Sequence, residues 1–130
     1  MIVLEVLGDP APQGSKKVVR GRLIEASKKL KPWRAAIEQA CQPYAGNNIH
    51  LGPIRLEVDF FLPRPATIKM TKRPYPLVPP DLDKLVRAVG DGIGQSGLIW
   101  GDDSQVVEVA ARKFYADDRE SGATIRIIPL

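Results

Sequence analysis

The sequence predicts an α+β fold in which a small mixed or antiparallel sheet carries two helices. Apolar and polar residues alternate over 54–60, as on a strand with one buried face. Apolar residues recur every three or four positions over 27–42 and 82–93, as on helices with one buried stripe. Because 130 residues and 14.3 kDa are the size of one domain, we expect a single domain over residues 1–130.

The elements of the first part follow in order from these patterns. Residues 2–7 are almost entirely apolar and are predicted to form a strand. The segment 8–15 is rich in proline and glycine and is predicted to be a loop, after which 16–25 forms a second extended piece. The first predicted helix, 27–42, ends before Pro43, since proline cannot continue a helix.

The second part contains a long irregular segment between strand and helix. Residues 62–80 include six prolines, a composition typical of loops that carry function. The second helix, 82–93, follows it directly and has glycines available to end it. Two more strands are predicted over 105–115 and 123–128, and the polar segment 117–122 is predicted to join them as a hairpin turn.

Composition excludes several classes of protein. With 130 residues and 44% hydrophobic content, the chain is long and apolar enough for a buried core. A single cysteine, Cys41, rules out an internal disulfide framework, and we expect its thiol to be packed in a helix. The apolar N-terminal segment is too short to span a membrane and lacks the marks of a signal peptide. We therefore expect a cytoplasmic protein without a membrane partner.

Charge is distributed unevenly along the chain. Residues 1–80 carry 13 Lys and Arg against 6 Asp and Glu, whereas residues 81–130 carry 6 against 9. This segregation fits a protein that binds phosphates with one region and a cation with the other. The alternative is an ordinary solvated surface. The candidate DNA-binding residues are Lys16, Lys17, Arg20, Arg22, Arg64, Lys69, Lys72 and Arg73.

Five aspartates fall within a 23-residue window: Asp81, Asp83, Asp91, Asp102 and Asp103. Carboxylates suit a hard divalent cation, so this window predicts a site for Mg²⁺, with Mn²⁺ as the alternative. Asp81 and Asp83 are two residues apart, so in extended backbone ahead of a helix their side chains point the same way. For one metal site to form, the turn after the helix must bring Asp102 and Asp103 back to the end of the helix that carries Asp81 and Asp83. A metal site in a basic protein indicates cleavage of nucleic acid.

Each acidic motif also has a simpler interpretation. Asp81 could be present simply as a helix cap, without any role in metal binding. Asp83, Arg87 and Asp91 could form a surface ion-pair ladder of about 0.3–0.5 kcal/mol per pair. The later doublet could be an ordinary turn before a strand. The conjunction of the motifs favours the metal site.

Two motifs lie between residues 80 and 107: Pro80-Asp81-Leu82-Asp83-x-Leu85-x-x-Ala88-x-x-Asp91-Gly92 and Gly97-Leu98-Ile99-x-x-Asp102-Asp103-x-Gln105-Val106-Val107. Together they resemble the RusA family of Holliday-junction resolvases, which are found in bacteria and their phages. The resemblance implies that Asp81, Asp83 and Asp103 bind Mg²⁺ and are catalytic, with Asp102 supporting them. It also implies a homodimer that binds four-way DNA junctions and cuts two opposed strands symmetrically, in DNA recombination and repair.

The chain departs from the family pattern at two basic residues. Lys84 stands where the family has asparagine, and Arg87 stands where it has a helix lysine. Both are candidates to face the scissile phosphate, although arginine holds its proton more firmly than lysine. Two other functions stay open at this point: a branched-DNA-binding protein that does not cleave, and a general metal-dependent DNase. Tyr75 is a candidate for stacking on an opened base pair, with packing as its alternative, as for Trp33.

Overall fold

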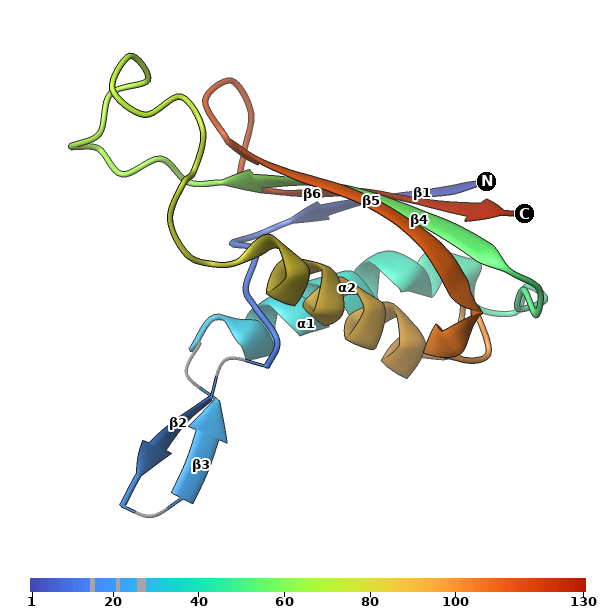
Figure 1. Cartoon of the computed structure of the whole chain (residues 1–130). Helices are drawn as coiled ribbons and strands as arrows, with labels where there is room; N and C mark the ends of the chain where they lie inside the picture. The colour runs from blue at the N-terminus through green and yellow to red at the C-terminus, as the bar shows by residue number, and fades with distance from the viewer. Residues whose placement is uncertain (15, 21, 26–27) are drawn as a thin grey trace.

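The computed structural model describes residues 1–14, 16–20, 22–25 and 28–130, and two helices lie on one face of its four-stranded sheet (Figure 1). The sheet consists of β1 (Ile2–Leu7), β4 (Ile54–Leu62), β5 (Val106–Tyr115) and β6 (Gly122–Pro129). The helices are α1 (Leu30–Cys41) and α2 (Leu82–Ser96), with short 3-10 turns η1 (Gln42–Tyr44) and η2 (Asp103–Gln105). Strands β2 (Lys16–Val19) and β3 (Arg22–Glu25) form a separate antiparallel hairpin that extends away from the sheet. The single extended piece predicted over 16–25 is therefore wrong, because the chain turns back at Arg20, whose φ is 51°.

The sheet is mixed, with strand order β1-β6-β4-β5. Strand β6 pairs antiparallel with both β1 and β4, whereas β4 and β5 are parallel. The predicted α+β class, with a small mixed sheet and two helices, is confirmed. The predicted hairpin at 117–122 is wrong, because β4 lies between β5 and β6. The reason is the apolar character of β6, which buries Ile125 and Ile127 and therefore occupies a central position.

The core lies between the sheet and the helices. Alternate residues of β4, from Ile54 to Leu62, point toward the helices, as the period of two predicts. Trp33 and Cys41 of α1 are buried there, so the packing interpretation of both is confirmed. Burial raises the pKa of the Cys41 thiol. No helix in the described ranges combines the length and apolar composition that crossing a membrane requires.

The connection from β4 to β5 determines where the acidic residues lie. Parallel neighbouring strands need a crossover connection, and here α2 is its helix. The chain leaves the end of β4, follows the proline-rich segment 63–80, and then returns along the sheet as α2 (Figure 1). The N-terminus of α2 therefore lies near the end of β4, and its C-terminus near the start of β5.

Gly122 begins β6 at a point where only glycine fits. Its φ is 156°, and an added Cβ would collide with the carbonyl oxygen of Val6. We expect Gly122→Ala to lower the free energy of unfolding by about 3 kcal/mol, from backbone strain and overpacking together. Gly46→Ala is the control, since Gly46 also has positive φ but nothing within 4 Å of an added Cβ. It should cost only about 1–2 kcal/mol in the same urea denaturation experiment. Equal losses would contradict the collision.

Candidate active site

The N-terminal end of α2 presents two acidic side chains. Asp81 is the N-cap residue with extended backbone (φ −70°, ψ 141°), yet its side chain makes no capping hydrogen bond. Its carboxylate instead lies 3.8 Å from Lys84 Nζ. The capping interpretation of the Asp81 side chain is therefore wrong. Asp83 is exposed within the first helical turn, so the alternation expected of extended backbone does not apply to this pair.

Two contacts from distant parts of the chain hold this end of the helix. Lys113 of β5 donates from Nζ to the carbonyl oxygens of Val78 (2.9 Å) and Pro80 (3.0 Å). The backbone N–H of Gln13 donates to the carbonyl oxygen of Lys84 at 3.0 Å. The segment that precedes Asp81 is thus attached to the sheet. Sequence reasoning missed Lys113. The available signal was its place on the predicted strand, where it continues the apolar face of Val109 and Ala111 as a lone cation.

Arg87 does not form the ion-pair ladder that its spacing suggested. Its guanidinium lies beside Gly14 instead, where an added Cβ would be 2.9 Å from Nη1. No ion pair joins it to Asp83 or Asp91, and all three residues belong to the part of the chain that the structure describes. The ladder interpretation is therefore wrong.

The C-terminal end of α2 holds Asp103. The indole N–H of Trp100 donates to Asp103 Oδ1 at 2.8 Å, and Trp100 is only 1% exposed. The carboxylate lies against Gly94 of α2, where a side chain would displace it. Asp103 itself is exposed, so an oriented carboxylate faces solvent at this position. Neither Trp100 nor Gly94 was recognised from the sequence as a positioning residue.

Asp102 caps η2, as the turn interpretation predicted. Its Oδ2 accepts hydrogen bonds from the backbone N–H and the hydroxyl of Ser104, and these bonds lower the pKa of the Asp102 carboxyl. Gln105 completes the turn. Its Oε1 accepts from the backbone N–H groups of Gly101 and Asp102 at 2.8 Å, and its Nε2 donates to the carbonyl oxygens of His50 and Gly52. One side chain therefore ties the doublet to the loop before β4.

The two acidic groups do not meet within one chain. Asp81 precedes Leu82, and Asp103 lies beside Gly94; the helix between these two positions is about 18 Å long. Asp91, Asp102 and Asp103 line one open pocket of about 270 Å³, whereas Asp81 lines another. Within residues 1–14, 16–20, 22–25 and 28–130, no three His, Cys, Asp or Glu side chains are grouped to hold a metal ion. The expected return of the doublet is therefore wrong for a single chain, because the crossover places the two motifs at opposite ends of α2.

The candidate DNA-binding cations differ in whether their side chains are exposed or are bonded within the protein. Lys69 and Lys72 are exposed on the proline-rich segment, and Arg20 is exposed at the turn between β2 and β3. Arg73 donates from Nε to the Tyr115 hydroxyl at 2.8 Å. The side chains of three further candidates lie outside the described residues: Lys16, Lys17 and Arg22.

Arg64 has a structural role that the sequence did not indicate. Its guanidinium donates to both carboxylate oxygens of Asp117, at 2.6 and 3.0 Å, and to the carbonyl oxygen of Arg73 at 2.7 Å. It also stacks 4.0 Å from the centre of the Tyr115 ring. The hydrogen bonds from Arg64 lower the pKa of the Asp117 carboxyl. Arg64 therefore clamps the proline-rich segment to the turn that follows β5.

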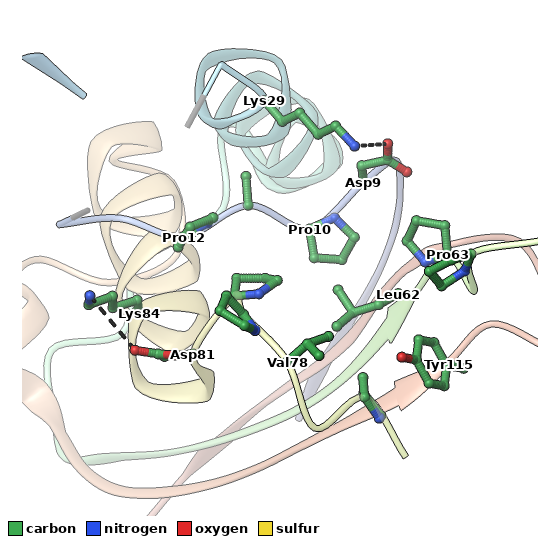
Figure 2. Close-up of a pocket in the computed structure, with 15 residues that line it drawn as sticks. Asp9, Pro10, Pro12, Lys29, Leu62, Pro63, Val78, Asp81, Lys84 and Tyr115 are labelled. Atoms are coloured by element: carbon green, nitrogen blue, oxygen red, sulfur yellow. Dashed lines mark hydrogen bonds and ion pairs between the residues drawn. The ribbon is translucent and has the colours of Figure 1, made fainter. Parts of the chain in front are cut away.

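A pocket of about 580 Å³ opens beside Asp81 (Figure 2). Proline rings from the first loop, which follows β1 and contains Pro10 and Pro12, and from the 63–80 segment line this pocket, together with Tyr115. Two ion pairs lie at its edge, Lys29 with Asp9 and Lys84 with Asp81. The sequence indicated the proline-rich segment as functional, but nothing in it paired that segment with the first loop.

The α+β fold is shared by proteins of many functions, so the function has to be inferred from the site and from related proteins. The family model for endodeoxyribonuclease RusA matches residues 8–128. The chain therefore belongs to the RusA endodeoxyribonuclease family, as the two motifs predicted, and membership supports nuclease activity on DNA. It is also similar to the uncharacterized protein YqaN of Bacillus subtilis (strain 168), with 26% identity over 137 residues, covering 96% of this chain and 95% of that protein.

Lys113 offers a direct test of how the Asp81 end is held. We expect Lys113→Met to lower the free energy of unfolding by about 2 kcal/mol, because two carbonyl groups lose a charged donor. Proteolysis within the 63–80 segment should also become faster. Lys69→Met, which changes an exposed lysine of that segment, should alter neither urea denaturation nor proteolysis. A Lys113→Met protein indistinguishable from this control would show that the anchor is unimportant.

Proposed function

We propose that the chain is a Mg²⁺-dependent, structure-selective endonuclease that resolves Holliday junctions by paired nicks in DNA recombination and repair, with Mn²⁺ as a substitute metal. One observation carries the proposal: a member of an endodeoxyribonuclease family holds exposed carboxylates at both ends of one helix. Exposed carboxylate oxygens are ligands that fit Mg²⁺. Asp81, Asp83 and Asp103 would hold the metal, with Asp102 supporting the turn.

The proposed chemistry divides into a metal contribution and a protein contribution. When bound, the metal would activate a water molecule and polarise the scissile phosphate. Trp100 fixes the orientation of Asp103, and Gln105 fixes the turn that carries it. Lys84 lies beside Asp81, so its ammonium group is placed to stabilise phosphate charge there. Arg87 would serve the same purpose from the next turn of α2.

The separation of the two acidic groups requires a second subunit, so we propose a two-fold dimer. Asp83 and Gly94 are equally far from a point between Ala88 and Val89, which lies within one residue of the midpoint of α2. Two α2 helices crossing antiparallel at that point would place Asp83 of one subunit near Asp103 of the partner subunit. The two-fold axis would then generate two equivalent sites, one for each of two opposed strands.

Two features of the surface support this arrangement. An added Cβ at Gly90, beside the midpoint of α2, would meet nothing within 4 Å, so the helix backbone is accessible there. Val107 and Val109 of β5, the strand beside α2, are 62% and 51% exposed. A partner subunit would cover this apolar surface. The exposed cations Arg20, Lys69 and Lys72, together with Lys16, Lys17 and Arg22, would bind the DNA arms.

Cleavage of a labelled four-way junction and of a matched linear duplex, with and without Mg²⁺, tests the function. We expect paired nicks in the junction only, and only with metal. Asp83→Asn should lower the rate by at least the roughly 10–100-fold that loss of a supporting group costs at a metal site. Asp118→Asn, which changes an exposed aspartate of the turn before β6, is the matched control and should cut normally.

The two alternatives predict different products from the same reactions. Equal cutting of the linear duplex would indicate a general metal-dependent DNase. Metal-independent binding to the junction without any nicked product would indicate a branched-DNA-binding protein that does not cleave.

Mixed dimers test whether the proposed site is shared. Asp83→Asn and Asp103→Asn subunits should each be inactive alone. Co-expressed, they should form dimers with one site lacking both carboxylates and one site intact, which nicks a single strand. Asp81→Asn with Asp83→Asn is the control pair; because both changes lie at the same end of α2, neither site is intact in any dimer. A shared site is excluded if the first mixture, with mixed dimers verified, stays as inactive as the control pair.

A further inference from the structure

We propose that the proline-lined pocket beside Asp81 takes up one unpaired nucleobase of the bound DNA strand. The inference rests on the proposed function, since it assigns a role to the surface next to the proposed metal site. The pocket has a volume of about 580 Å³, within the range of sites that bind small organic molecules. Asp81 forms part of its lining, so an occupant would lie next to the phosphate proposed to be cut.

The walls of the pocket suit the flat face of a base. Pro10 and Pro12 come from the loop after β1 (Figure 2). Pro76 and Pro79 come from the segment before α2. The proline rings form an apolar surface against which any of the four bases could pack. Tyr115, which is 6% exposed and has Arg64 over its ring, also lines the pocket. A base removed from its own stack exposes such faces to water, and contact with these rings would cover them.

The walls are also held in place before any ligand arrives. Lys113 binds the carbonyl oxygens of Val78 and Pro80, and Arg64 binds that of Arg73 while stacking on Tyr115. Proline restricts the backbone of both lining segments further. An occupant therefore finds a formed cavity and does not have to order the loop around itself.

The charges at the edge of the pocket favour a nucleotide over a purely apolar ligand. Lys29 and Lys84 lie at this edge, with side chains 64% and 39% exposed, so both can reach phosphates on either side of the base. The Asp9 carboxylate accepts hydrogen bonds from Lys29 and Ser121, each at 3.1 Å, and retains lone pairs for an amino group of the base. An apolar peptide would leave the four charged side chains of the two ion pairs at this edge, Lys29 with Asp9 and Lys84 with Asp81, without a role.

The test uses 2-aminopurine, a fluorescent base analogue whose emission rises when it leaves the base stack. The probe is placed in turn at each position flanking the branch point of a four-way junction, and the protein is added in EDTA so that no cleavage occurs. We expect fluorescence to rise several-fold at one or two positions. Replacing the responsive base by an abasic residue should weaken binding of the unmodified protein by roughly tenfold, whereas an abasic residue elsewhere should not.

A pocket-filling variant connects the signal to this cavity. Val78→Trp places an indole in the pocket from a partly exposed position and should abolish the rise in fluorescence. Val3→Trp makes the same change at a similarly exposed site on β1 and should leave the rise intact. Light scattering on both variants shows whether either change alters the oligomeric state.

The outcomes separate this inference from the proposed nuclease. A protein that cuts the junction but causes no rise in fluorescence at any probe position would overturn base uptake and leave the proposed nuclease activity standing. A protein that causes the rise in fluorescence but never cuts the junction would overturn the proposed nuclease activity and leave base uptake standing. Base uptake is also overturned if the rise in fluorescence persists in Val78→Trp. If that variant changes only the oligomeric state, base uptake is overturned as well, because the pocket would then be a contact between subunits.

Discussion

The parallel pairing of β4 with β5 is the constraint on which the rest of this structure depends. Parallel neighbours cannot be joined by a tight turn, so the chain must cross back over the sheet, and α2 makes that crossing. A helix that crosses back has its two ends at opposite ends of the strands. The aspartates before the helix and those after it are therefore separated by its length. A shared metal site in this topology requires two copies of the chain.

Each end of α2 is held by contacts from outside the helix. At the N-terminal end, Lys113 and the backbone of Gln13 bind carbonyl groups around Asp81. At the C-terminal end, the Trp100 indole orients Asp103 and Gln105 fixes the turn. Lys113 lies in β5 and Trp100 lies in the core, so each end of the helix has one donor on a rigid element. Such preorganisation is what a metal or phosphate site requires, because ordering flexible ligands lowers affinity.

The basic residues show that charge composition alone cannot identify a DNA-binding surface. Arg64 and Arg73 are as basic as Lys69 and Lys72 and lie in the same segment. The first two bind Asp117 and Tyr115 and stabilise the segment, whereas the two lysines are exposed on it. A guanidinium can satisfy several acceptors in a plane, which suits it to clamp a proline-rich segment whose backbone has few N–H donors. The lysines retain their charge for an external partner.

The sequence by itself determined the two helices, the four strands of the sheet, the α+β class, the family, and the burial of Trp33 and Cys41. These follow from local periodicity and from short motifs, which neighbouring residues encode. Only the tertiary structure decided that β6 lies between β1 and β4, that α2 separates Asp81 from Asp103, and that the proline-rich segment faces the first loop across a pocket. Strand order and loop packing depend on contacts between residues far apart in the chain, and the period of a single segment carries no information about its neighbours in space.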